Sequence, residues 1–579
     1  MSDGRGMGKR MGWLGLKDWA GCGFLARLSR DTRANTIAIV AAALIPLCGM
    51  IGGGFDLSRM YIVKTRLQHA CDAGALAGRK SMGGGTWAQS SYMPRTMAER
   101  FFDANIASDA YGSNTITKSY SENAGKVTGT ASAILPMTLM RVLGKTTETL
   151  TVTCESEMRL PNTDVMFVLD NTGSMASKAR ATDTMSKIDG LKQAVRCFYE
   201  IVARLDTVAN CDAGAPSGGT GSQVQIRFGF VPYSTNVNVG RLLPTDWMAD
   251  QANYNTRAQI GNSGNFRYGL MPVNVSGMKN GTGYNTTFDV QAGPNSGIRS
   301  TYRVNWTGCV EERKTAKTTD YTPIPSDALD LDVDTAPTPG DPDTQWRPGL
   351  PEITYMRKLR TSWDELNRDE VSSTSDTYYR YLQLIPYGFN YYCPAEARKL
   401  QQWPDASAFD AYVSSLTPTG NTYHDIGMIW GARLMSPDGM FKSENQFTPQ
   451  GGEIQRHMIF MTDGDAVSSN CDYNAYGIHF YDRRQTDDVG NWQNCMNGTS
   501  LNSLTGQINS RLEALCDVVK NKNITLWVVS FGGGNLQSTE DRLERCASPG
   551  RYFLANDSAA LQRTFKSIAD QISALRLIK

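Results

Sequence analysis

Three oxygen-bearing side chains at alternate positions are the first indication of chemistry in this sequence. Asp170, Thr172 and Ser174 follow the apolar run Val165–Leu169, which predicts a buried strand of a parallel sheet. In a tight loop the three side chains can turn toward one point. Hard divalent cations prefer oxygen ligands, and Mg²⁺ prefers them in a near-octahedral array. The D-x-T-x-S pattern therefore predicts a metal site. Two hydroxyls and one carboxylate neutralise only part of the charge of a divalent cation, so an acidic group of a partner could bind to the ion as well.

Two later segments carry further oxygen ligands. Thr422 lies in a polar loop within 416–434, just before an apolar-faced helix. Asp463 lies in 456–465, where an apolar strand ends in Thr-Asp-Gly. A helix N-cap at Ser174 and a turn after Asp463 would explain each segment singly, but not the set.

Together the three segments resemble the von Willebrand factor A (VWA) domain and its metal-ion-dependent adhesion site. The resemblance assigns Asp170, Thr172 and Ser174 to the first motif, Thr422 to the loop threonine and Asp463 to the T-D-G aspartate. The motifs follow one another in the family's order. The resemblance implies a divalent cation at these five residues, with Mg²⁺ expected and Mn²⁺ or Ca²⁺ as alternatives. It also implies that the ion binds a carboxylate on a protein partner.

The expected fold is an α/β doubly wound, mostly parallel sheet. Strands are expected at 165–169, 224–233, 457–461, 524–531 and 551–554, and helices at 186–205, 409–416, 504–521 and 559–577. Ligands of such sheets bind at the carboxyl ends of the strands. Asp170 and Asp463 both lie at such ends, as a shared metal site requires.

This core is expected in two parts, 161–233 and 405–579, on either side of an insertion at 234–404. A structureless loop of that length would be unusual, so the insertion is expected to be a subdomain. Within it, 327–343 contains six Asp and several Pro, which predicts an acidic, mobile linker. The tyrosine-rich stretch 378–393 fits an exposed recognition strand or a packed strand equally well.

The N-terminal region predicts a membrane anchor. Residues 1–35 hold seven Lys or Arg against three Asp, a net charge of 7 − 3 = +4, and form a basic tail. Residues 36–55 carry no charged side chain, and about 20 mostly apolar residues span a bilayer as a helix. The basic flank places the N-terminus in the cytoplasm. The alternatives are a cleaved signal peptide, for which the run is long, and a buried soluble helix, against which the flanking charges argue.

After the span, 56–160 is expected to hold a continuing helix and a small α+β module. Residues 30–82 resemble the N-terminal segment of the TadE/TadG-like family of Flp (tight-adherence) pilus assembly. The resemblance rests on R-x-x-x-[GA]-N before the span, Pro46 inside it, D-x-[SG]-R at 56–59 and L-Q-x-A-x-D-A-x-A-L-A at 67–77. Cys71 and Gly74 stand where alanine is usual in that family.

An anchor of this kind followed by a VWA domain is the arrangement of TadG proteins. The resemblance implies a single-pass protein of the bacterial inner membrane, with its N-terminus in the cytoplasm and its bulk in the periplasm. It implies a binding function in Flp/Tad pilus assembly, with a pilin or another assembly subunit as the partner. The alternative is a cell-surface VWA adhesin that binds host or matrix ligands.

Cysteine usage fits an extracytoplasmic location. Ten of the twelve cysteines follow the expected span, and their dispersal predicts disulfides in an oxidising compartment rather than reduced thiols. The favoured pair is Cys516–Cys546, because the two residues flank the expected strand 524–531 on helices that would pack around it.

Composition and motifs argue against other function classes. The net charge of +1 gives no indication of nucleic-acid binding. The sequence contains no H-E-x-x-H, no P-loop and no G-x-S-x-G motif, so no enzyme is expected. His424 and Asp425 lie beside Thr422, but their position at a helix start favours capping or surface packing over acid–base chemistry.

Overall fold

The computed structural model describes residues 32–82, 87–123, 126–157, 162–204, 225–294, 298–357, 370–373, 378–380, 392–447, 454–490 and 501–573. The chain divides into two compact units, Met1–Met158 with Arg576–Lys579 (unit 1) and Arg159–Leu575 (unit 2). Most of the basic tail expected at 1–35 lies outside the described residues, as does most of the tyrosine-rich stretch.

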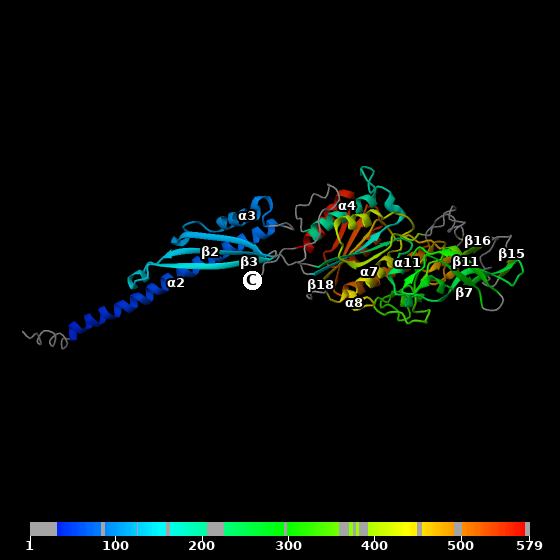
Figure 1. Ribbon diagram of the computed structural model, residues 1–579, viewed down its shortest axis with the longest axis horizontal. Coiled ribbons are helices and arrows are strands. Elements are labelled where there is room, and N and C mark those ends of the chain that lie inside the picture. Colours follow the sequence, from blue (N-terminus) through cyan, green and yellow to red (C-terminus); the bar gives the residue numbers. More distant parts are fainter. Residues whose placement is uncertain are drawn as a thin grey trace, which may run out of the picture. The chain divides into compact units, whose positions relative to one another are not determined.

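Unit 1 is a long helix packed on a small antiparallel sheet. Its elements are α2 (Thr32–Met82), α3 (Gln89–Asn105), β1 (Asn114–Asn123), β2 (Lys126–Pro136) and β3 (Thr147–Glu157). The sheet order is β1-β2-β3 (Figure 1). Alternate residues of β2 are buried because one face of the sheet packs on the second half of α2. The predicted α+β module is present, although β1 was not expected.

The D-x-[SG]-R motif fastens α2 to the loop that follows β2. The buried Asp56 carboxylate accepts hydrogen bonds from the backbone N–H groups of Thr138, Leu139 and Met140 at 2.8–3.0 Å. Arg59, one turn later, donates to the carbonyl oxygen of Pro136 at 3.2 Å. The motif therefore satisfies backbone groups that would otherwise lack partners beside the helix.

The two departures from the family pattern have structural causes. Cys71 of α2 forms a disulfide with Cys154 of β3. Gly74 leaves space for an aromatic ring, because a Cβ atom at this position would lie 2.1 Å from the Tyr120 Oη and 2.8 Å from the Ala98 carbonyl oxygen. Cys71 therefore links α2 covalently to β3, and Gly74 lets α2 lie closer to Tyr120 and Ala98 than alanine would permit.

The expected span, 36–55, lies within α2 and includes Pro46. Large apolar side chains such as Ile39, Val40 and Met50 are exposed in this part of the helix. Across the described residues, no helix combines the length and the apolar character that crossing a membrane requires.

Unit 2 contains a six-stranded sheet in the order β17-β5-β4-β18-β21-β22. The strands are β4 (Asn162–Asp170), β5 (Ile226–Tyr233), β17 (Arg398–Gln401), β18 (Ile454–Thr462), β21 (Ile524–Phe531) and β22 (Tyr552–Ala555). Adjacent strands run parallel except β17, which pairs antiparallel with β5. Nearly every residue of the central strand β4 is buried, because helices cover both faces of the sheet.

Different helices cover the two faces (Figure 1). One face packs on α4 (Lys187–Arg204), α6 (Ala406–Ser414) and α13 (Ser558–Ile572). Phe167 of β4 contacts Phe198 of α4 there, with ring centroids 5.3 Å apart. The other face packs on α7 (His424–Met435), α11 (Asn502–Asn521) and α12 (Gln537–Cys546). The favoured disulfide, Cys516–Cys546, is confirmed and joins α11 to α12.

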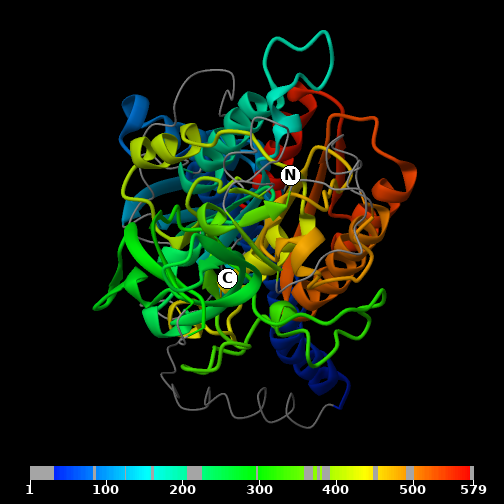
Figure 2. The ribbon, with the colours of Figure 1, turned by 90° about the vertical axis from the view of Figure 1, so that its right-hand side faces the viewer.

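The insertion covers the α7 side of unit 2 and shares its hydrophobic core. Its larger sheet has the order β11-β10-β7-β15, with β6 also paired to β7. These strands are β6 (Gln251–Gln259), β7 (Asn265–Asn274), β10 (Thr287–Ala292), β11 (Ser300–Asn305) and β15 (Glu370–Ser373). Trp346 of the insertion contacts Trp430 of α7 at 5.1 Å between ring centroids. All residues of α7 are buried as a result, and Figure 2 shows the insertion (green) away from α4 (teal) and α13 (red).

The prediction of a mobile linker at 327–343 is wrong. Asp330 is fully buried and forms an ion pair with Arg511 of α11. Leu331 and Val333 pack in the core shared with the main sheet. Asp332 accepts hydrogen bonds from the backbone N–H groups of Asp334 and Thr335, and Asp334 forms an ion pair with Lys522. Asp327, Asp341 and Asp343 are exposed, so the middle of the segment is bound into the fold while its two ends carry solvated charges.

Candidate metal centre

The candidate site lies where two adjacent parallel strands end. β4 and β18 pair in register up to Leu169 and Met461. Asp170 is the last residue of β4, and Asp463 directly follows β18. The carboxyl ends of parallel strands meet at one edge of a sheet, so the two carboxylates, nearly 300 residues apart in sequence, belong to the same edge.

Asp170 holds the two loops together. Its Oδ1 accepts a hydrogen bond from the backbone N–H of Thr172 at 2.9 Å. Its Oδ2 accepts from the Thr462 hydroxyl at 2.9 Å and from the backbone N–H of Asp463 at 3.3 Å. Because Asp170 is fully buried, these bonds are shielded from water and fix both loops relative to each other.

The two predicted hydroxyl groups form a hydrogen-bonded chain that leads from the buried Asp170 toward solvent. The Thr172 and Ser174 hydroxyl oxygens lie 2.9 Å apart. Ser174 in turn donates to Oδ1 of Asp463 at 2.7 Å. Thr172 is buried, whereas Ser174 is exposed. Four of the five predicted residues therefore form one hydrogen-bonded cluster with an open side at Ser174.

The fifth residue, Thr422, lies on an adjoining loop. Gly173 donates its backbone N–H to the Gly420 carbonyl at 3.0 Å, and Thr419 donates to the Asn171 carbonyl at 2.9 Å. Thr422 is buried, and its backbone pairs with Val467. In the part of the chain that the structure describes, its hydroxyl does not join the hydrogen bonds of the cluster.

Two carboxylates and one ammonium determine the electrostatics of the cluster. Burial, and then repulsion by Asp463, raises the pKa of Asp170 to about 7, against the opposing effect of hydrogen bonds from Thr172 and Thr462. Lys187, the first residue of α4, places its Nζ 3.0 Å from Oδ2 of Asp463. Sequence reasoning missed Lys187, because no motif or spacing connects it to the three loops.

His424 and Asp425 have other roles than those expected. Both are buried, and the helix N-cap is Tyr423. His424 Nε2 lies 2.9 Å from the Thr462 hydroxyl, and burial lowers the pKa of His424 to about 3. Asp425 pairs with Arg511 at 2.8 Å. The prediction of capping or surface packing is therefore wrong, because both side chains are bound inside the unit.

The donor set suits a hard divalent cation. Its candidate ligands are two carboxylates and three hydroxyls, all oxygen donors of the kind that Mg²⁺, Mn²⁺ or Ca²⁺ bind. Asp170 and Asp463 repel each other, and among the described residues their one ion pair is with Lys187, at Oδ2 of Asp463. A bound cation would relieve the remaining repulsion. Among the residues described, no group of three or more His, Cys, Asp or Glu side chains could hold a metal ion. Any site here would depend on hydroxyl ligands.

Comparison with known proteins bears on the N-terminal segment. Residues 35–89 match the family described as putative Flp pilus-assembly TadE/G-like. The TadE/G-like match covers most of α2 and ends at the first residue of α3. It leaves all of unit 2 unassigned. A comparison with curated proteins gives no match.

Several solved structures show weak likeness to the chain. The SpaC pilus adhesin of Lactobacillus rhamnosus GG is 11% identical with a TM-score of 0.29, over 79% of this chain and 34% of SpaC. A PilB minor pilin variant of Streptococcus sanguinis is 12% identical (TM-score 0.28; 79% of this chain, 78% of that one). The vWF domain of the Porphyromonas gingivalis pili tip protein Mfa5 is 9% identical, with a TM-score of 0.29, over 72% of this chain and 96% of that domain. The chain thus spans about a third of SpaC, and likenesses at these scores support no conclusion about function.

Proposed function

We propose that this chain is a membrane-anchored, extracytoplasmic component of Flp/Tad pilus assembly. In this proposal unit 2 is a VWA-type domain that binds a protein partner through a divalent cation, and it has no enzymatic activity. The partner is a pilin or another assembly subunit. The TadE/G-like segment at 35–89 supports the pilus association.

The observation that carries the binding proposal is the hydrogen-bonded cluster at the ends of β4 and β18. Asp170 fixes the two loops, while Thr172, Ser174 and Asp463 bring their oxygens together. Thr422 would complete the set from the adjoining loop. When bound, a divalent cation supplies an open coordination position for a partner's carboxylate. The exposed Ser174 lies on the side from which that carboxylate would approach.

The residues also explain how the site keeps its shape without a partner. Buried Asp170 accepts three hydrogen bonds, and the loop of Thr422 is tied to 171–173 through backbone bonds. Rigid, preorganised ligands lose little entropy on binding. The sheet below is held by its apolar core, so the cluster is free to serve binding rather than folding.

Copurification tests this function. Tagged full-length protein would be recovered from piliated cells in Mg²⁺ and, separately, after chelation with EDTA. We expect pilin or assembly subunits in the Mg²⁺ sample, and their loss with EDTA and in Asp170→Ala. Asp517→Ala, which removes a carboxylate that is 63% exposed on α11, is the matched control. Equal recovery of pilus components from all samples would contradict the proposal, as would recovery of only a host or matrix ligand.

A further inference from the structure

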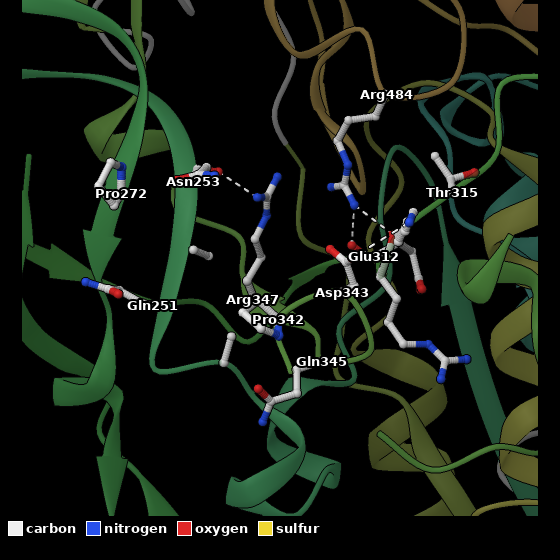
Figure 3. Close-up of a pocket in the computed structure, with 14 residues that line it drawn as sticks. Gln251, Asn253, Pro272, Glu312, Thr315, Pro342, Asp343, Gln345, Arg347 and Arg484 are labelled. Atoms are coloured by element: carbon white, nitrogen blue, oxygen red, sulfur yellow. Dashed lines mark hydrogen bonds and ion pairs between the residues drawn. The ribbon is translucent and has the colours of Figure 1, made fainter. Parts of the chain in front are cut away.

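A polar pocket lies mainly in the insertion, and none of its lining residues belongs to the candidate metal centre. Its volume is about 400 Å³, within the range of small-molecule sites. Residues of β6 and β7, the segments 312–315 and 342–347, and Arg484 line it (Figure 3). Four of the lining side chains are cationic, Arg313, Lys314, Arg347 and Arg484, whereas only two are anionic, Glu312 and Asp343.

Among the described residues, two guanidinium groups of this pocket donate hydrogen bonds to the same carboxylate, that of Glu311. Arg347 Nε and Arg484 Nη1 both donate to Oε2 of Glu311, at 2.7 and 3.2 Å. The other carboxylate oxygen of Glu311 accepts from the Tyr473 hydroxyl at 2.5 Å. One carboxylate cannot neutralise two cations, so a positive charge remains at this wall of the pocket.

Arg347 Nη2 also contacts Oε2 of Glu311, yet within the described part of the chain both guanidinium groups keep N–H donors that have no partner. Arg347 also donates to the Asn253 carbonyl at 2.6 Å, and Arg484 Nη2 donates to the carbonyls of Glu312 and Arg313 at 2.5 and 2.8 Å. A guanidinium carries five N–H groups in a fork that matches oxyanions. Figure 3 shows the two side chains reaching the same part of the pocket.

The nearby charges do not balance this excess. Glu312 is occupied by Arg433, at 2.9 Å. Arg313 is only 2% exposed, and its Nε has no hydrogen-bond partner among the described residues. Burial, and then repulsion by Arg433, lowers the pKa of Arg313 to about 10. Burial and Glu311 raise the pKa of the adjacent Asp482 to about 7, so this group carries only part of a charge near neutral pH.

We propose that this pocket binds the oxyanion group (carboxylate, sulfate or phosphate) of a polar, sugar-sized ligand. The oxyanion would take the remaining N–H donors of Arg347 and Arg484. Gln251, Asn253 and Gln345 offer amide groups in the same lining, which suit hydroxyl groups. The site is distinct from the metal centre and needs no cation.

Two exposed residues of opposite charge line the pocket, so their neutralisation should change anion affinity in opposite directions. Lys314 and Asp343 form an ion pair at 3.5 Å, with side chains 49% and 65% exposed, so neither substitution threatens the fold. Calorimetric titration would use the full-length protein with glucuronate, sulfate and phosphate as probes, and glucose as the uncharged control. Comparison of the three anions identifies which oxyanion is preferred.

We expect at least one anion to bind, and glucose to bind at least tenfold more weakly. Lys314→Gln should weaken binding roughly two- to fivefold and Asp343→Asn should strengthen it by a similar factor, the usual size for exposed charges. Lys399→Gln and Glu444→Gln, an ion pair outside the pocket lining, should change nothing. Absence of anion binding, or equal affinities in the wild type and the two pocket variants, would overturn the proposal.

Discussion

At the scale of single residues, the candidate metal centre depends on how Lys187 and the two carboxylates share charge. Lys187 Nζ lies 3.0 Å from Asp463 and is the cation nearest to the cluster that the described contacts show. An ammonium at a candidate ligand competes with a metal ion for the same oxygen. We therefore predict that Lys187→Met raises Mg²⁺ affinity, by about 1–2 kcal/mol or roughly tenfold, at a partly buried site.

Calorimetric titration of Mg²⁺ measures this effect. Lys192→Met is the matched control, because Lys192 lies on the same helix but donates to the Ser414 carbonyl instead. The control should bind Mg²⁺ like the wild type. If Lys187→Met also binds with wild-type affinity, the ammonium does not compete with the ion.

A second prediction at this scale concerns His457 in β18. Burial, and then Arg551, lowers the pKa of His457 to about 4 from its ordinary value of 6.5. The unfolded chain therefore takes up a proton first as the pH falls. The protonation of the unfolded chain lowers the free energy of unfolding. The full stability is present above pH 6.5, and up to about 3 kcal/mol of it is lost as the pH falls toward 4.

Urea unfolding between pH 7 and 4 tests this prediction on the fragment that begins at Asn162. His457→Gln keeps an acceptor for the Trp527 Nε1, which lies 3.2 Å from the His457 Nδ1, but cannot be protonated. Its stability should fall less steeply with pH than that of the wild type. Parallel curves would show that His457 is not held neutral by its surroundings.

At the scale of elements, the close packing of α2 against its neighbours restricts which side chain position 74 can carry. Gly74→Ala would place a Cβ atom 2.1 Å from the Tyr120 Oη, and overpacking of this kind costs about 1–3 kcal/mol. Gly54 of the same helix has nothing within 4 Å of the corresponding position. Gly54→Ala should therefore leave unit 1 unchanged or slightly more stable.

Hydrogen exchange of the β2 amides in the full-length protein reports on unit 1 alone. We expect faster exchange in Gly74→Ala and wild-type or slower exchange in Gly54→Ala. Equal protection in the two variants would mean that the Tyr120 ring moves aside at little cost.

Sequence reasoning located most elements of unit 2 that pack through their own apolar pattern. The strand expected at 524–531 agrees with β21, and the helix expected at 186–205 agrees closely with α4. It missed β17, and it placed Cys546 on a helix without giving the bounds of that helix, α12. β17 has only four residues and pairs antiparallel at the edge, so no period marks it. α12 is strongly polar along its length, and only a few of its residues reach the core.

The candidate site was predictable to a similar degree. The ligand types of Asp170, Thr172, Ser174 and Asp463 follow from local motifs, and the structure brings these residues into one cluster. Lys187 could not be found this way, because its contact with Asp463 joins residues 276 apart in sequence. Only the fold brings such residues together.

At the scale of the whole molecule, buried charges join the insertion to the core of unit 2. Arg511 of α11 pairs with Asp330 of the insertion and with Asp425 of α7, and all three side chains are inaccessible to solvent. Removing one partner of such a pair leaves an uncompensated buried charge. The insertion is thus bound into the fold, which the acidic composition of 327–343 did not reveal.

The proposed topology also belongs to this scale. The basic tail and the uncharged run at 36–55 predict a single span with the N-terminus in the cytoplasm. Protease added to spheroplasts should then digest unit 2 and leave only the N-terminal region intact. Protection of unit 2 in intact spheroplasts, with digestion after lysis, would show that the orientation is wrong.

The central claim is that the loops after β4 and β18, together with the adjoining loop of Thr422, form a divalent cation site. Calorimetric titration of Mg²⁺ or Mn²⁺ into the fragment that begins at Asn162 tests this claim most directly. The comparison is between the wild type, Asp170→Ala and the surface control Asp517→Ala, with circular dichroism to confirm that each is folded. We predict one binding event in the wild type and the control, and none in folded Asp170→Ala. Equal heats and affinities in all three proteins, or no binding by the wild type, would contradict the claim.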